Sequence, residues 1–156
     1  MVLTEQLGPL LYERKKMKVP ANINKIWKRA IRARLRSYSP YSKFRVGAAF
    51  QAGSEVVSGC NIENASYGAT LCAERVAIFK AVSEGRSLIK DMVVVADTKD
   101  PTPPCGLCLQ VMTEFCPPDL NIWMATSKKV FRKVLLSDLL RIPFSRTNLL
   151  SKSKSK

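Results

Sequence analysis

Residues 92–96, Met-Val-Val-Val-Ala, constrain the fold more than any other stretch of this 156-residue chain. An apolar, β-branched run of this length is typical of a strand that is buried on both faces. Such a strand needs a covering layer on each side, because neither of its faces carries a polar side chain. The sequence therefore predicts one α/β domain with three layers, in which helices cover both sides of a mixed central sheet.

Eight elements are predicted, this strand included, in the order α-β-β-α-β-α-β-α. Apolar residues at helical spacing place the helices at 23–35, 71–84, 105–115 and 134–140. Short apolar or alternating runs place the strands at 45–51, 55–60, 92–96 and 120–125. Asn22 or Asn24 is expected to cap the first helix, and Gly85 to end the second.

The formal net charge of +14 is concentrated at the two ends of the chain. Residues 1–36 and 127–156 each carry +8, and the middle carries −2. Basic ends favour weak, non-specific binding of nucleic acid, although a solvated tail and helix face explain the same charge. No aromatic stripe interleaves the lysines, so a specific nucleic-acid module is not indicated. We expect a basic extension at 1–21, a folded domain at 22–144 and a disordered Lys/Ser tail at 145–156.

The chain contains no histidine, and this narrows its chemistry. Ser-His-Asp triads, Cys-His pairs and histidine-ligated metals are excluded, so a metal would be held by thiolate or carboxylate. The chain does not open on a signal-peptide pattern, and no apolar run is long enough to span a membrane. Glu5 and Glu13 argue against a mitochondrial transit peptide. We expect a cytoplasmic protein, with nuclear access left open, and five reduced cysteines.

Two cysteine motifs at predicted helix starts carry the candidate chemistry. Cys105 and Cys108 are three residues apart, so both sulfurs lie on one helical face and can reach one metal ion. A helix N-terminus also favours thiolate over thiol. Taken alone, a CxxC pair fits a redox dithiol or a structural zinc knuckle equally well.

The second motif, Cys72-Ala73-Glu74-Arg75, favours a catalytic zinc site. Three thiolates would leave the fourth tetrahedral position open for water, whereas a closed Cys₄ site would need a second CxxC. A carboxylate beside that water is what metal-assisted hydrolysis needs to move protons. Arg75 is a candidate to donate hydrogen bonds to the thiolates, with an exposed surface arginine as the alternative.

Asn61 and Glu63 alternate at the end of the second predicted strand, so their side chains face the same side. An amide and a carboxylate aimed together suit the hydroxyls of a ribose, although polar strand ends are common. Cys60 is expected to pack, reduced, in its strand. The sequence assigns no role to Cys116.

Four segments, in order and spacing, resemble the small homotetrameric, zinc-dependent cytidine deaminases over residues 28–144. The segments are 41–49 (Tyr-Ser-Lys-Phe-Arg-Val-Gly-Ala-Ala), 59–68 (Gly-Cys-Asn-Ile-Glu-Asn-Ala-Ser-Tyr-Gly), 72–75 (Cys-Ala-Glu-Arg) and 104–108 (Pro-Cys-Gly-Leu-Cys). The resemblance implies the cytidine-deaminase fold, one zinc ion per chain, and pyrimidine salvage by hydrolytic deamination of cytidine and 2′-deoxycytidine.

The resemblance also implies roles for single residues. Cys72, Cys105 and Cys108 would hold zinc, a zinc-bound hydroxide would be the nucleophile, and Glu74 would shuttle its protons. Arg75 would partner the ligand thiolates. Within one chain, the implied substrate contacts are Phe44 on the pyrimidine, Asn61 and Glu63 at the ribose 3′-hydroxyl, and the Ala73 backbone at the base edge. Tyr67 and Phe144 would contact the substrate of a neighbouring subunit, in a homotetramer with shared active sites.

The sequence departs from the family pattern where subunits would meet. Leu109 stands where an arginine is usual, and Pro143 is displaced within residues 139–144. Three other functions stay open: deamination of another cytosine compound such as blasticidin S or dCMP, RNA binding or editing through the basic ends, and a structural zinc module. The Asn-x-Glu segment favours a free nucleoside. Cys72 argues against nucleotide and nucleic-acid deaminases, which usually have histidine at this position.

Overall fold

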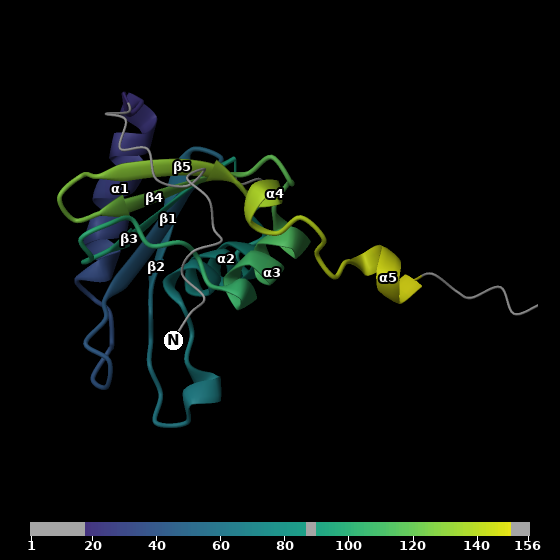
Figure 1. The fold of residues 1–156 in the computed structure, drawn as a ribbon, viewed down its shortest axis with the longest axis horizontal. Coiled ribbons are helices and arrows are strands. Elements are labelled where there is room, and N and C mark those ends of the chain that lie inside the picture. The colour runs from purple at the N-terminus through teal and green to yellow at the C-terminus, as the bar shows by residue number, and fades with distance from the viewer. Residues whose placement is uncertain (1–17, 87–89, 151–156) are drawn as a thin grey trace, which may run out of the picture.

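A five-stranded mixed sheet lies between two helical layers in the computed structural model, which describes residues 18–86 and 90–150. The strand order is β2-β1-β3-β4-β5, with β3 and β4 parallel and all other neighbours antiparallel. The strands are β1 (Val46–Ala52), β2 (Glu55–Cys60), β3 (Asp91–Ala96), β4 (Asn121–Thr126) and β5 (Phe131–Leu135). Their arrangement can be followed in Figure 1.

Helix α1 (Ala21–Arg34) covers one face of the sheet, and α2 (Ala73–Ser83) and α3 (Gly106–Phe115) cover the other. Three short helical segments complete the described part of the chain: η2 (Tyr67–Ala69), α4 (Leu136–Leu139) and α5 (Arg146–Leu150). The prediction of a three-layer α/β/α fold with a mixed sheet is confirmed. No helix in the described residues has the length and apolar character that a membrane span requires.

The central strands send alternate side chains into two separate cores. In β3, Met92 and Val94 pack with α2 and α3, whereas Val93 and Val95 pack with α1. β4 divides its side chains in the same way. Successive side chains of a strand point to opposite faces, so a strand between two helical layers has no solvent-facing side. The prediction of a strand buried on both faces is confirmed.

Two glycines let the helices approach the sheet closely. Gly47 in β1 lies beneath α1, where an added Cβ would stand 2.1 Å from the carbonyl oxygen of Ala30. Gly59 in β2 lies beneath α2, where a Cβ would stand 2.6 Å from the Ala77 nitrogen and 2.7 Å from the Ala73 oxygen. The first turns of α2 therefore rest directly on the backbone of β2.

The predicted closing helix at 134–140 is wrong in its first part. Residues 134 and 135 belong to β5, which pairs antiparallel with β4, and only Leu136–Leu139 of this stretch are helical. The turn before β5 uses Lys129 in the left-handed region (φ 62°), where no glycine or asparagine marks it. Charged residues in β5 obscured the strand pattern, although charge is common on an edge strand, where it discourages aggregation.

The predictions for the two ends of the domain also need correction. Neither Asn22 nor Asn24 caps α1, which follows Pro20 without a side-chain cap. Asn24 instead donates from Nδ2 to the carbonyl oxygens of Val19 and Pro20, 3.4 Å from each. The tail expected to be disordered from residue 145 contains the helix α5. Residues 1–17 of the basic extension and 151–156 of the tail lie outside the described residues.

Replacing Gly59 by alanine should destabilise the protein by about 2 kcal/mol or more, because the new methyl would overlap backbone atoms of α2 that cannot rotate away. Gly68→Ala is the matched control, since a Cβ there meets nothing within 4 Å, and it should change stability by less than about 0.5 kcal/mol. Chemical denaturation of both variants measures the difference. Equal losses would contradict the close packing of α2 on β2.

Candidate active site

The N-termini of α2 and α3 meet at three cysteine sulfurs. Cys72 and Cys105 are the N-cap residues of the two helices, and Cys108 lies in the first turn of α3. The Cys105 sulfur is 3.7 Å from that of Cys72 and 3.5 Å from that of Cys108, and all three lie within 4.8 Å of one another. Free N–H groups and the positive dipole ends of both helices favour the thiolate form here.

These separations fit a tetrahedral zinc ion. Zn–S bonds of about 2.3 Å place pairs of ligand sulfurs about 3.8 Å apart, close to the spacing observed. Among the described residues, no fourth cysteine or carboxylate joins the cluster. The described part of the chain therefore offers three thiolate ligands, which would leave one tetrahedral position for a smaller ligand, as in catalytic zinc sites.

Hydrogen bonds determine which thiols of the three cysteines lose their protons most easily. Arg75 donates from Nη2 to the Cys72 sulfur at 3.8 Å and to the Thr70 carbonyl oxygen at 3.0 Å. Hydrogen bonds from Cys108 and Arg75 lower the pKa of Cys72 to about 5. The pKa of Cys108 is raised, because its thiol donates to Cys72 and is buried. A bound metal replaces the remaining protons, since the ligands must be thiolates.

Glu74 places a buried carboxyl group beside the three sulfurs without belonging to the ligand set. It lies in the first turn of α2 with 4% of its surface exposed. Burial, together with the charge of the nearby Cys72 thiolate, raises the pKa of Glu74 to about 7, against the lowering effect of hydrogen bonds to its own backbone and to Cys108. A carboxyl group that titrates near neutrality can both accept and return a proton.

An isolated β-bridge holds the predicted ribose-binding residues next to the three cysteines. Ile62, between Asn61 and Glu63, exchanges backbone hydrogen bonds of 2.9 and 3.0 Å with Leu71. Leu71 immediately precedes Cys72, so the end of β2 and the first cysteine ligand lie side by side. The structure thus brings together residues that the sequence placed in two separate motifs.

Asn61 is buried, and the chain uses most of its hydrogen-bonding capacity. Its Oδ1 accepts from the Ser37 hydroxyl at 2.6 Å and from the Val46 nitrogen at 2.8 Å. Its Nδ2 donates to the Phe44 carbonyl oxygen at 2.8 Å. Asn61 therefore organises the loop between α1 and β1.

Glu63 fixes the other part of the same loop. Its Oε2 accepts from the backbone nitrogens of Tyr41 and Ser42 at 2.9 and 3.2 Å, and the Ser42 hydroxyl donates to Oε1. These bonds, above all that from the hydroxyl, lower the pKa of Glu63. The Ser42 oxygen also accepts from the nitrogen of Phe44, whose ring is exposed. Asn61 and Glu63 together set the position of Phe44.

Ser37 and Ser42 were missed by the sequence analysis. Nothing in the residue types around them indicated which distant side chains the two serines would meet. Both hydroxyls bond to residues more than 20 positions away, so the contacts exist only in the folded chain.

Tyr67 and Phe144 do not join the cluster within one chain. They are 77% and 60% exposed. The Tyr67 ring packs edge-on against Tyr41 with 6.2 Å between ring centroids, and the backbone oxygen of Phe144 accepts from Gln110 at 2.7 Å. Ala73, in contrast, is buried at the start of α2 beside the cysteines.

The remaining residues singled out by the sequence pack within the fold. Leu109 is buried in the core beneath α2 and α3. Cys60 is half-buried in β2, and neither it nor Cys116 is in a disulfide. Cys116 ends α3 in the core, where burial raises the pKa of its thiol to about 12.

Residues 20–124 match the sequence model of the cytidine and deoxycytidylate deaminase zinc-binding region. A cytidine deaminase of Halalkalibacterium halodurans is 52% identical over 114 residues, which cover 72% of this chain and 86% of that protein. One of Sporosarcina psychrophila is 43% identical over 129 residues, covering 82% and 95%. The crystal structure of a cytidine deaminase from Burkholderia pseudomallei matches with a TM-score of 0.74 at 40% identity, covering 78% of this chain and 98% of that one.

The matched region spans both helix starts that carry the cysteines, and the cluster has the donor set and spacing that zinc requires. The chain therefore belongs to the cytidine and deoxycytidylate deaminase family, with one zinc ion per chain.

Proposed function

We propose that the protein hydrolyses cytidine and 2′-deoxycytidine to uridine and 2′-deoxyuridine, with release of ammonia, as a step of pyrimidine salvage. The observation that carries this proposal is the buried Glu74 carboxyl group beside three cysteine sulfurs that can hold a metal ion, with no fourth ligand residue among those described. Relatives that share 52% and 43% identity and are named cytidine deaminases support the choice of substrate.

Zinc bound by Cys72, Cys105 and Cys108 supplies a Lewis acid that lowers the pKa of a water ligand toward about 7. Glu74 would accept one proton from the water that adds to C4 of the cytosine and would pass it to N3. It would then take the second proton from the hydroxyl group at C4 and give it to the amino group, so that ammonia leaves as the C4–N bond breaks and the C4=O bond of uridine forms. The buried position of Glu74 suits this role, because its carboxyl group changes protonation state near neutral pH.

Arg75 acts on the reaction through Cys72. Three thiolates on a divalent ion leave a net negative charge, which weakens the pull of the metal on its fourth ligand. The hydrogen bond from Arg75 Nη2 draws electron density from the Cys72 sulfur and partly offsets this effect. We assign Arg75 as a positioning residue.

The loop held by Asn61 and Glu63 forms the nucleoside side of the proposed site. The exposed Phe44 ring packs on the pyrimidine, and the backbone of Ala73 meets the base edge. The amide of Asn61 and the carboxylate of Glu63 hold the 3′-hydroxyl, which cytidine and 2′-deoxycytidine share. Since Ser42 already bonds to Glu63, the substrate hydroxyl shares that carboxylate with the serine.

Tyr67 and Phe144 are assigned to active sites of neighbouring subunits in a homotetramer. Both rings are exposed in the single chain, and neither lies in its cysteine cluster. Large exposed aromatic side chains are typical of subunit interfaces. Cytoplasmic location, nuclear access and the boundaries of the catalytic domain at 22–144 stay predictions.

The zinc-loaded protein should convert cytidine and 2′-deoxycytidine at comparable rates, followed by the loss of ultraviolet absorbance. The same assay with dCMP and blasticidin S tests the alternatives; a blasticidin-S deaminase of Bacillus cereus is 29% identical over 114 residues. Turnover of either compound without turnover of the nucleosides would overturn the proposed substrate. No turnover at all with zinc bound would overturn the proposed function.

Glu74→Gln should lower kcat by about 10²- to 10⁴-fold while zinc content stays at one ion per chain, because the amide cannot carry the proton. Glu84→Gln, at the other end of α2, should keep the wild-type rate. Metal analysis and initial rates on both variants measure this, with Cys105→Ala as the variant that loses zinc. Near-native turnover by Glu74→Gln would remove Glu74 from the mechanism.

Size-exclusion chromatography with light scattering should give a mass of about 70 kDa, four times the 17.4 kDa chain. Tyr67→Ala should raise KM or lower kcat even if it remains tetrameric, since its ring is assigned to a neighbour's pocket. A monomeric protein with full activity would contradict the shared sites.

A further inference from the structure

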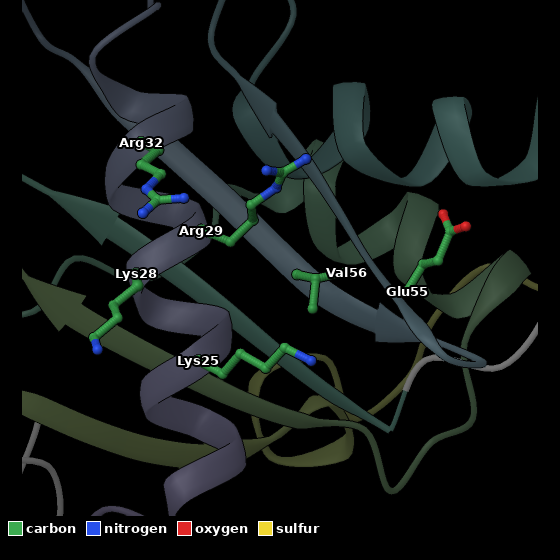
Figure 2. Close-up of a pocket in the computed structure, with 6 residues that line it drawn as sticks. All are labelled: Lys25, Lys28, Arg29, Arg32, Glu55 and Val56. Carbon is green, nitrogen blue, oxygen red and sulfur yellow. The ribbon is translucent and has the colours of Figure 1, made fainter.

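Four basic side chains line a groove on the opposite face of the sheet from the cysteine cluster. Figure 2 shows this groove, which has a volume of about 520 Å³. It lies between α1 and the start of β2 and is lined by Lys25, Lys28, Arg29, Arg32, Glu55 and Val56. The residues of α1 that pack on the sheet belong to a different core cluster from those around the cysteines. The groove is therefore separate from the proposed active site.

The basic row runs along the exposed side of α1. Lys25, Lys28, Arg29 and Arg32 follow the spacing i, i+3, i+4 and i+7, which aligns side chains on one helical face. The buried residues Ile23, Ile26 and Ala30 anchor the opposite face of the helix. Two like-charge pairs therefore stand four residues apart, an arrangement that destabilises a helix.

Among the residues that the structure describes, acidic side chains do little to neutralise this row. Within residues 18–86 and 90–150, no acidic side chain forms an ion pair with any of the four cations. Glu55, the acidic member of the lining, pairs with Arg86, and its carboxylate points away from α1 in Figure 2. Lys129 adds a further positive charge on the other side of α1, with its ammonium 5.1 Å from the centre of the Trp27 ring. The repulsion would be relieved by an anionic ligand.

We infer that this groove binds the phosphate backbone of a nucleic acid without regard to base sequence. The four cations extend about 10 Å along the helix axis, which suits a polyanion better than a single phosphate. The two arginines present planar forks that match phosphate oxygens. None of the described residues that line the groove is aromatic, so these residues offer no surface on which bases stack.

The composition of the groove favours nucleic acid over a membrane surface. Val56 is the apolar member of the lining, and the apolar side of α1 is buried on the sheet. Binding in the plane of a bilayer requires an exposed apolar face that inserts between lipids. Contacts made by charge alone predict an affinity that falls steeply with salt and differs little between sequences.

The test measures binding of the full-length, zinc-loaded protein to fluorescein-labelled single-stranded RNA and DNA of about 20 nucleotides, by anisotropy over a salt series. The groove variant is Lys25→Gln/Lys28→Gln/Arg29→Gln/Arg32→Gln. Its matched control, Lys80→Gln/Lys90→Gln/Lys99→Gln/Arg141→Gln, removes four exposed cations elsewhere. Both variants lower the formal charge from +14 by four and leave every basic residue of the segments 1–21 and 145–156 unchanged.

The groove variant should bind at least about tenfold more weakly at low salt, and the slope of log K against log salt should fall by about 3, at roughly 0.7 per lost phosphate contact. The control should change affinity by less than about threefold. The RNA and DNA arms identify which polymer binds more tightly, and groove-dependent binding of either one supports the inference.

Equal losses in the two variants would overturn the inference, because net charge alone would then explain binding. Tighter, groove-dependent binding to phosphatidylserine vesicles than to either polymer would also overturn it, in favour of a membrane surface. Thermal unfolding and zinc content establish that both variants fold. If the fourfold groove variant does not fold, the comparison uses two double variants. The groove variant is then Lys25→Gln/Arg29→Gln, the control is Lys80→Gln/Lys90→Gln, and their affinities for the labelled oligonucleotides should differ by about threefold.

Discussion

The meeting of three cysteine sulfurs between two helix N-termini is the constraint on which the rest of the structure depends. As thiolates, groups within 4.8 Å of one another repel strongly, so they stay together only with positive charge around them. The helix ends, Arg75 and a zinc ion supply that charge. For the two N-termini to meet, α2 and α3 must pack side by side on one face of the sheet. The close contact of α2 with Gly59 fixes how near α2 lies to the sheet.

The sheet separates two regions of different chemistry. On one face, a buried carboxyl group lies beside a thiol cluster that reaches the surface at Cys105, and burial moves the pKa of Glu74 into the range useful for proton transfer. On the other face, α1 presents a row of solvated cations. The alternating side chains of β3 and β4 fill the space on both sides, so each region has its own supporting core.

Local patterns predicted the parts of the fold whose causes are local. The buried strand at 92–96, the hairpin of β1 and β2 and the positions of α2 and α3 follow from side-chain periodicity. Periodicity failed at β5, because charges on an edge strand interrupt the alternation and a lysine occupies the left-handed turn position. It also misplaced the cap of α1, where a proline precedes the helix and no polar side chain bonds to its first turn.

The sequence by itself determined the range of ligand chemistry of this protein. With no histidine, a metal site had to use thiolate or carboxylate ligands, and the cysteines at two predicted helix starts, with Glu74 two residues after Cys72, favoured three thiolates beside a carboxyl group. Only the tertiary structure decided how deeply Glu74 is buried. It also decided that Asn61 and Glu63 bond to the loop that carries Phe44. The backbone hydrogen bonds of Ile62, which lies between these two residues, then connect this loop to the segment that carries Cys72. The physical reason is distance along the chain. Spacing fixes which side chains share a helix turn, whereas contacts between residues tens of positions apart depend on how the helices and strands pack.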